Sequence, residues 1–205
     1  VESLPSGKFD AVCHLAAQSS GPRSLHIPYS DLQANAASTL LLTRWCIENK
    51  IYRFLYASSM AVYGNPGISL VTEDVSCLPV SYYGVSKLTS ENLLRLAETE
   101  GLKTTSFRMF SVYGPGQDLS NRDQGMLSIY LSYLLEGSVL PVTGSLERFR
   151  DFVYIDDVID AWINAITTEE TPHRTYNIGS GEKTTVRELI GLLLDELNLP
   201  EDHPV

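Results

Sequence analysis

Tyr83, Lys87 and Ser59 are the residues of this chain whose types and spacing could support proton transfer. Tyr83 and Lys87 stand four positions apart in Y-G-V-S-K, and residues at this spacing lie on the same face of a helix. A free phenol titrates near ~10 and is a poor base at neutral pH. We expect the adjacent ammonium, together with another positive charge held in a low-dielectric site, to lower the pKa of Tyr83, so that Tyr83 acts as a general base.

The segment upstream predicts where this pair acts. L-Y-A-S-S-M-A-V-Y-G (55–64) is an apolar strand that runs into two serines and a turn, and Tyr83 follows Ser59 by 24 residues. Ligands of an open parallel sheet bind beyond the carboxyl ends of its strands, which is where Ser58 and Ser59 are expected. Y-x-x-x-K alone occurs by chance on exposed helices, so the prediction depends on this context.

The elements that position these residues alternate along the first half of the chain. Strands are expected near 9–17, 53–59 and 103–110, with helical patterns between them, and this alternation predicts a parallel sheet. After Gly116 the pattern changes to a polar loop, a helix near 126–137 and short strands around L-P-V-T-G, R-D-F-V-Y-I and T-Y-N-I-G. A helix is expected at 156–167, and Thr185 with Glu188 predicts a capping box at the start of a last helix.

The composition is that of a soluble globular protein, with 43% hydrophobic and 20% charged residues. No apolar run approaches the ~20 residues of a membrane span, and no signal peptide opens the chain. A net charge of −10 argues against nucleic acids and anionic membranes as partners. Cys13, Cys46 and Cys77 lack metal-ligand spacing, so we expect no metal site, and we expect reduced thiols in a cytoplasmic protein.

Four further segments carry a resemblance to a known family. They are F-D-A-V-C-H-L-A-A-Q (9–18), F-R-M-F-S-V-Y-G-P-G-Q (107–117), R-D-F-V-Y-I-D-D-V (150–158) and Y-N-I-G-S-G (176–181). With the serine strand and Y-G-V-S-K, these resemble the extended short-chain dehydrogenase/reductases, the NAD-dependent nucleotide-sugar epimerases and dehydratases. The resemblance implies an α/β fold, in which residues 1–116 form part of a Rossmann-like doubly wound parallel sheet. It also implies a smaller α+β substrate lobe over 117–205, from which 150–165 returns to the main sheet.

Two departures from the family concern the ends of the chain. The glycine-rich turn that holds the dinucleotide pyrophosphate at a helix N-terminus is not found, and Val1 aligns just before the family's fourth strand. Pro204 and Val205 follow soon after the last helix, where relatives continue. We therefore expect an internal piece of a longer enzyme, which holds NAD poorly by itself.

The resemblance implies a role for individual residues toward NAD. It places the nicotinamide between Tyr83 and Phe110, and the Lys87 ammonium on the nicotinamide ribose. Ser58 is expected to face the cofactor amide or merely to end its strand. The remaining cofactor-binding candidates belong to the loop after the first strand and to the helix beneath it: Leu15, Ala16, Ala17, Gln18 and Asn35. For Asn35, a buried helix polar residue is the equal alternative.

Toward the sugar nucleotide, Ser59 aligns with the residue that hydrogen-bonds the reacting hydroxyl. Arg150 aligns with an arginine that pairs with the substrate phosphate through its planar donor fork. Ser111 replaces the asparagine that relatives use for the sugar diphosphate, and its shorter reach puts that contact in doubt. Arg148 is expected to be a solvated charge on a turn, and His14 a core histidine.

Met60 and Ala61 discriminate between reactions within the family. Sugar dehydratases carry acidic residues after the serine, whereas neither a thioether nor a methyl group transfers a proton. This favours an NAD-dependent 4-epimerase of a nucleotide sugar. The resemblance implies a UDP-hexose as the substrate and a homodimer formed through helices near 31–49 and 82–100. A 4-keto nucleotide-sugar reductase and a catalytically silent nucleotide-sugar or NAD-binding module remain alternatives.

Overall fold

The computed structural model describes residues 4, 7–67, 70–168 and 174–200. Contacts divide the chain into two compact units, each described here by itself. Unit 1 comprises Val1–Met109 and Asp160–Ile178, and unit 2 comprises Phe110–Ile159 and Gly179–Val205. The first segment of unit 1 ends at Met109, before the expected boundary at Gly116. Unit 1 also includes a later segment, Asp160–Ile178, which was expected in the second domain.

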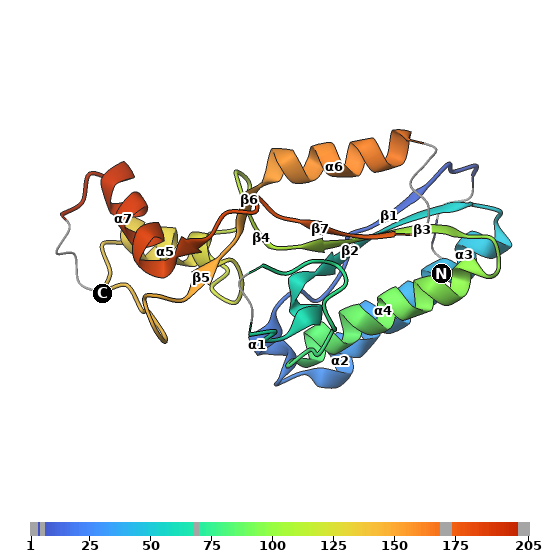
Figure 1. Cartoon of the computed structure of the whole chain (residues 1–205), viewed down its shortest axis with the longest axis horizontal. Helices are drawn as coiled ribbons and strands as arrows, with labels where there is room; N and C mark the ends of the chain where they lie inside the picture. Colours follow the sequence, from blue (N-terminus) through green and yellow to red (C-terminus); the bar gives the residue numbers. More distant parts are fainter. Residues whose placement is uncertain (1–3, 5–6, 68–69, 169–173, 201–205) are drawn as a thin grey trace. The chain divides into compact units, whose positions relative to one another are not determined.

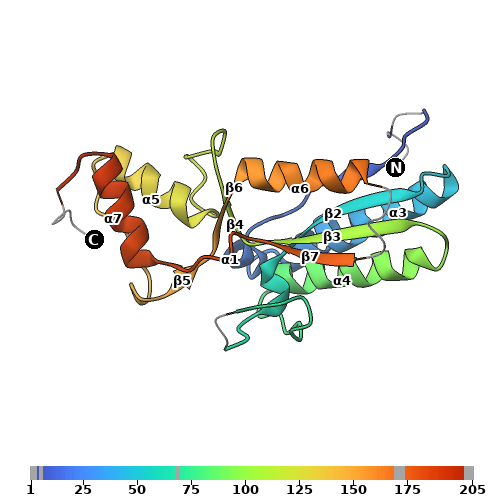
Figure 2. The ribbon, with the colours of Figure 1, turned by 45° about the horizontal axis from the view of Figure 1, so that its top comes forward.

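Unit 1 is built on a four-stranded parallel sheet of order β1-β2-β3-β7. Its strands are β1 (Val12–His14), β2 (Arg53–Ser59), β3 (Lys103–Met109) and β7 (Arg174–Ile178). Figures 1 and 2 show helices α3 and α4 on one face of this sheet and α6 on the other. The central strand β2 is buried along nearly its whole length, which is the pattern of a parallel strand covered on both faces. This confirms the predicted parallel sheet.

Unit 1 contains short and long helical segments before β3. In chain order they are α1 (Gly21–Ser24), α2 (Pro28–Leu32), the π-helical turn η1 (Gln33–Ala37), α3 (Ser38–Glu48), the 3-10 turn η2 (Met60–Tyr63) and α4 (Tyr82–Glu98). The single helix expected over 31–49 is thus interrupted by η1, and π-helical turns occur frequently at functional sites. Helix α6 (Ile155–Thr167) crosses from one unit to the other and matches its prediction to within one residue.

A compact apolar core lies between the sheet and helices α3 and α4. It is formed by Cys46, Ile51, Phe54, Tyr56, Leu94, Ala97 and Leu102. On the opposite face of the sheet, Trp162 of α6 packs on Phe107 with ring centroids 5.0 Å apart. Burial on both faces holds the carboxyl ends of β1, β2 and β3 in fixed relation to one another.

Unit 2 packs helix α5 (Met126–Leu135) against helix α7 (Val186–Glu196), with Tyr130, Leu134 and Leu189 in its core. Strands β4 (Ser111–Tyr113) and β6 (Phe152–Tyr154) form one parallel pair. Strands β5 (Phe149–Arg150) and β8 (Thr184–Thr185) form an antiparallel pair. The predicted capping box at Thr185 and Glu188 is present.

Three expectations about the second half of the chain are corrected. The R-D-F-V-Y-I strand does not return to the main sheet, because β6 pairs with β4. Strand β7 was expected mainly in the substrate lobe, yet it pairs in parallel with β3 in unit 1. Finally, L-P-V-T-G (140–144) forms no strand. In each case short apolar stretches predicted extended backbone without revealing its pairing partner.

Candidate active site

Ser59 and Tyr83 come together where β2 ends and α4 begins. Ser59 is the last residue of β2 and caps the turn η2, because its hydroxyl accepts a hydrogen bond from the Ala61 amide at 3.2 Å. Tyr83 lies in the first turn of α4, which Ser81 caps through the Gly84 amide. A Cβ atom on Gly84 would lie 2.5 Å from the Ala61 carbonyl oxygen, so only glycine lets α4 approach the serine turn this closely.

The pKa of Tyr83 differs from the sequence-based expectation. Burial raises the pKa of this phenol, hydrogen bonding to Ser59 lowers it in part, and the negative charge of Asp31 raises it further. In this structure Lys87 alone does not lower the pKa of Tyr83, because removal of the phenol from water outweighs the favourable contacts; the expected lowering also required a second positive charge in the site. The Ser59 hydroxyl is close enough to Tyr83 to influence the pKa of its phenol.

Lys87 is buried one helical turn after Tyr83, on the same face of α4. Its ammonium donates a hydrogen bond of 2.7 Å to the carbonyl of Ala57 and lies 5.6 Å from the centre of the Tyr83 ring. Burial lowers the pKa of Lys87 to about 8, although the charges of Asp31 and Glu91 act in the opposite direction. An ammonium has three N–H donors. Within the described part of the chain, hydrogen bonding to Ala57 uses one of them and leaves two for a ligand.

Asn35 ties η1 to the loop that follows β1. Its side chain accepts a hydrogen bond from the Gln18 amide at 2.9 Å and donates to the Gln18 carbonyl at 3.1 Å. Asn35 also donates to Asp31 and to Ser86. It is fully enclosed, so the structure uses Asn35 to set the backbone of the expected cofactor loop. Leu15, Ala16 and Ala17 of this loop are exposed, whereas Gln18 is half-buried.

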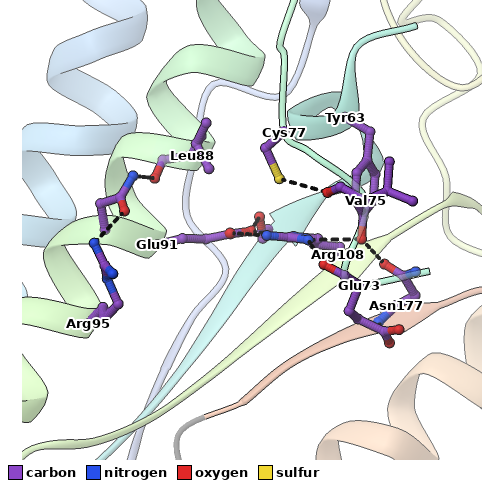
Figure 3. A network of polar contacts seen from close by, with 11 residues as sticks. Tyr63, Glu73, Val75, Cys77, Leu88, Glu91, Arg95, Arg108 and Asn177 are labelled. Carbon is purple, nitrogen blue, oxygen red and sulfur yellow. Dashed lines mark hydrogen bonds and ion pairs between the residues drawn. The ribbon is translucent and has the colours of Figure 1, made fainter. Parts of the chain in front are cut away.

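Ser58 contacts a second polar cluster, whose members Glu91, Arg108, Tyr63 and Asn177 are shown in Figure 3. Its hydroxyl donates to Glu91, which also forms a two-point ion pair with Arg108, with bonds of 3.0 and 2.7 Å. Arg108 continues to the hydroxyl of Tyr63 at 2.9 Å, and Tyr63 donates to Asn177 of β7. Ser58 and Ser59 therefore serve different clusters, although their partners Glu91 and Tyr83 both belong to α4.

Three residues of these clusters were missed in the sequence: Asp31, Glu91 and Arg108. A signal existed for Glu91, which lies four positions after Lys87 and eight after Tyr83 and therefore on the same helix face. For Asp31 and Arg108 the sequence offers only a short polar segment and a strand arginine.

His14 behaves as predicted: it packs on Tyr56 at 5.6 Å between ring centroids, and burial, with Lys87 as a second cause, lowers its pKa to about 4.

In unit 2, the expected substrate residues cluster near the strand pairs. Phe110 and Ser111 are half-buried, and the Ser111 amide donates to the carbonyl of Asp151 at 3.0 Å. Arg150 is also half-buried, and burial together with the neighbouring charge of Arg148 lowers its pKa. Within the described residues, its guanidinium donates one hydrogen bond, to the carbonyl of Phe149 at 2.8 Å.

Arg148 departs from the expectation of a solvated charge. It donates to the hydroxyl of Tyr130 at 3.1 Å and to the carbonyl of Thr143, and its Nε is enclosed without a partner in the described structure. Neither Arg148 nor Arg150 forms an ion pair with a described carboxylate. This part of unit 2 therefore concentrates positive charge, although the chain as a whole is acidic.

Met60 and Ala61 follow Ser59 in η2, so no acid or base occupies these two positions. Cys13, Cys46 and Cys77 are free thiols. In the described ranges, no group of three or more histidine, cysteine or acidic side chains could hold a metal ion. No helix there has both the length and the apolar character needed to cross a membrane.

Comparison with known proteins extends these observations. The chain is 30% identical to the UDP-glucose 4-epimerase of Mycolicibacterium smegmatis, covering 98% of this chain and 65% of that protein. It is 31% identical to a dTDP-4-dehydro-6-deoxyglucose reductase of Escherichia coli, covering 91% of this chain and 59% of that protein. The crystal structure of the UDP-glucose 4-epimerase of Thermotoga maritima with UDP-glucose matches with a TM-score of 0.89 and 32% identity, covering 96% of this chain and 63% of that one.

The chain thus spans about three fifths of the length of these relatives. Their sheets and flanking helices confirm the predicted Rossmann-like fold. The sequence model described as the NAD dependent epimerase/dehydratase family matches residues 1–179, which is most of the chain. From its fold, its serine, tyrosine and lysine, and this match, the chain belongs to the NAD dependent epimerase/dehydratase family.

Proposed function

We propose that the full-length protein epimerises a nucleotide sugar, a UDP-hexose, at carbon 4 with NAD as cofactor. One observation carries the proposal. Ser59, Tyr83 and Lys87 lie together at the end of β2, while the two positions after Ser59 hold Met60 and Ala61. This set can move one proton between the enzyme and a hydroxyl group, but it lacks the additional acid and base that elimination of water requires.

Tyr83 is the proton acceptor in this proposal. Its phenolate takes the proton of the C4 hydroxyl as the C4–H bond breaks, and it returns the proton when that bond forms again on the opposite face of the sugar. Ser59 hydrogen-bonds the same hydroxyl and orients it toward Tyr83. Because burial raises the pKa of Tyr83, its phenolate needs positive charge close by, and Lys87 is the cation within reach.

The residues at the strand ends fit the cofactor. Ala16 and Ala17 expose small side chains after β1, which lets a ligand approach the backbone, and Lys87 has two N–H donors to offer the ribose hydroxyls. When bound, NAD supplies a reversible acceptor for the hydrogen and electron pair that leave carbon 4. The loop at Gln18, held by Asn35, would then fix the position of the ligand relative to Tyr83.

Unit 2 supplies the contacts to the diphosphate in this proposal. Arg150 is half-buried beside Arg148, and the two have no described carboxylate partner. A planar guanidinium binds phosphate oxygens with two parallel hydrogen bonds. Ser111 contributes a shorter donor than asparagine would, and Phe110 lines the neighbouring strand end.

A reductase acting on a 4-keto nucleotide sugar is the second candidate. It is supported by the similar reductase of E. coli, which is as identical to this chain as the epimerases are. Such an enzyme would use the same three residues and would release the oxidised cofactor. Turnover without net consumption of a reductant therefore separates the two reactions.

The test uses the full-length protein with a UDP-hexose and catalytic amounts of NAD, followed by NMR of the sugar. We expect the two C4 epimers to interconvert without added reduced cofactor. Accumulation of a 4-keto-6-deoxy sugar would show that an acid and a base reach carbons 5 and 6 from elsewhere. Stoichiometric consumption of NADH or NADPH would instead assign the protein to the reductases.

We also propose that the protein is a cytoplasmic homodimer that associates through α3 and α4. Both helices expose large apolar side chains, among them Leu40, Leu41, Val85 and Leu96. Paired with a second copy, these helices would form a four-helix interface. Mass measurement of the full-length protein in solution checks the dimer, and a monomer at micromolar concentration would contradict it.

A further inference from the structure

Asp31 is a completely buried carboxylate that the mechanism above does not use. Its Oδ1 accepts a hydrogen bond from the Ser86 hydroxyl at 2.8 Å. Its Oδ2 accepts from the side-chain amides of Gln18 at 2.9 Å and Asn35 at 3.1 Å. Amide nitrogens donate and do not accept, so these partners suit an ionised carboxylate. No lysine or arginine of the described structure forms an ion pair with Asp31.

A buried charge without a contacting cation is costly, so its retention needs a reason. Lys87 is the opposite case, a buried cation without a contacting carboxylate in the described structure. The residue is 3% exposed, and the described partners of its ammonium are the Ala57 carbonyl and the rings of Tyr56 and Tyr83, at 4.9 and 5.6 Å. None of these groups is a carboxylate. Ser86, which holds Asp31, immediately precedes Lys87 in α4.

The charged and titratable groups around Lys87 come from four elements besides α2. They are His14 of β1, Tyr56 of β2, Tyr83 and Glu91 of α4, and Arg108 of β3. Of the two carboxylates that act on Lys87, Glu91 is paired with Arg108 at 2.7 Å, which offsets its field. Asp31 has only neutral donors, so its negative charge is not offset locally.

We propose that Asp31 is a positioning residue that provides the buried counter-charge of Lys87 and, through Gln18 and Asn35, couples that lysine to the loop after β1. The inference deepens the proposed function, on which it rests for the role of Lys87. Asp31 acts at a distance and touches neither of the reacting groups. Through its charge and its hydrogen bonds, Asp31 links the Lys87 ammonium, the helix turn at Ser86 and the loop after β1.

The test replaces Asp31 with Asn, which has nearly the same shape and no charge. The pKa of Lys87, about 8 in this structure, is held up by the negative charge of Asp31, so it falls when that charge is removed. In the full-length protein with 13C at the lysine ε-carbons, we expect the Lys87 titration midpoint to move down by about one pH unit. The Lys87 signal is assigned from its loss in Lys87→Arg.

The control is Ser86→Ala, which removes one donor to Asp31 and keeps the charge. We expect its Lys87 midpoint to stay close to that of the unaltered protein. A folded Asp31→Asn protein with an unshifted midpoint would overturn the proposal and leave Asp31 a structural residue. If Asp31→Asn does not fold, Asp31→Ser serves instead, because water can enter the space that its smaller side chain leaves.

The pH dependence of kcat/KM gives a second readout. Loss of the ammonium at high pH should move the alkaline limb of the Asp31→Asn profile to lower pH, whereas a structural defect would lower the rate equally at every pH. The lysine titration needs no nucleotide sugar. If the full-length protein fails to epimerise but the midpoint shifts, the proposed reaction is wrong and the counter-charge stands.

Discussion

The two units of this chain treat their charged side chains differently. Unit 1 buries Glu91 and Arg108, each with 8% of its side chain exposed, and satisfies both with each other and with neighbouring hydroxyls. Unit 2 keeps its ion pairs at the surface, as in Arg187 with Glu147, and gives Arg150 a single backbone carbonyl. The buried charges of unit 1 are thus paired within the protein, whereas Arg148 and Arg150 of unit 2 have no described carboxylate partner and are completed by an anion only in the proposed function.

The largest expected effect follows from breaking the buried pair. Arg108→Ala leaves Glu91 buried without its cation and should lower the free energy of unfolding by ~3–5 kcal/mol. The matched control in unit 2 is Arg187→Ala, whose exposed pair should contribute ~0–1 kcal/mol. Urea denaturation of the full-length variants measures both values. Equal losses for the two arginines would remove the distinction between the units.

The next effect concerns catalysis within unit 1. Tyr83→Phe removes the proposed proton acceptor and should lower kcat by at least ~10²-fold, with NAD still bound. Folding should be little affected, because phenylalanine fills the same buried volume. The control is Tyr82→Phe at the exposed neighbouring position, for which we expect normal turnover. A Tyr83→Phe enzyme of near-normal kcat would exclude Tyr83 from the mechanism.

A smaller effect is expected for the arginine cluster of unit 2. Arg150→Ala should weaken the binding of the nucleoside diphosphate by ~1.5–3 kcal/mol, the value of a charge-assisted hydrogen bond. NAD affinity and unfolding free energy should change little, because the described partner of Arg150 is one carbonyl group. Calorimetric titration with each ligand measures this. Parallel loss of both affinities would indicate a structural arginine.

The smallest effect is a pH dependence of stability that originates in unit 1. Burial lowers the pKa of His14 from 6.5 to about 4, so the unfolded chain binds this proton first as the pH falls. Stability is therefore lost between pH 6.5 and about 4, amounting to about 1 kcal/mol at pH 5.5. His14→Phe should flatten this part of the stability curve, whereas His26→Asn, at an exposed site, should not. An unchanged slope in His14→Phe would assign the acid sensitivity to carboxylates.

Much of unit 1 was predictable because its signals are local. The Y-G-V-S-K spacing, the buried strand before Ser59 and the strand-helix alternation each depend on a short stretch of sequence, and the structure brings Ser59, Tyr83 and Lys87 together. The pairing of β6 with β4 and of β7 with β3 was not predictable in this way, since it joins segments distant in the chain. The contact of Asp31 with Ser86, 55 positions later, was not predicted for the same reason.

The pKa of Tyr83 illustrates a different limit. The sequence places a lysine one turn away but does not show how deeply the phenol is buried or that Asp31 lies near it. Those two influences raise the pKa and reverse the expected sign. Arg148 is a comparable case, because its contacts with Tyr130 and Thr143 depend on the packing of unit 2.

The alternation of Ser58 and Ser59 has a consequence for how β2 can vary. Ser58 lies opposite Arg108 and Ser59 opposite Met109 in the pairing with β3. Inserting one residue before Ala57 would move Ser58 into the reactive position and place Ala57 opposite Glu91. Deleting one residue there would keep a serine opposite Glu91 and place Met60 at the reactive position. Either change therefore removes one of the two hydroxyls from its site. The length of this strand is accordingly under tighter constraint than the identity of most of its side chains.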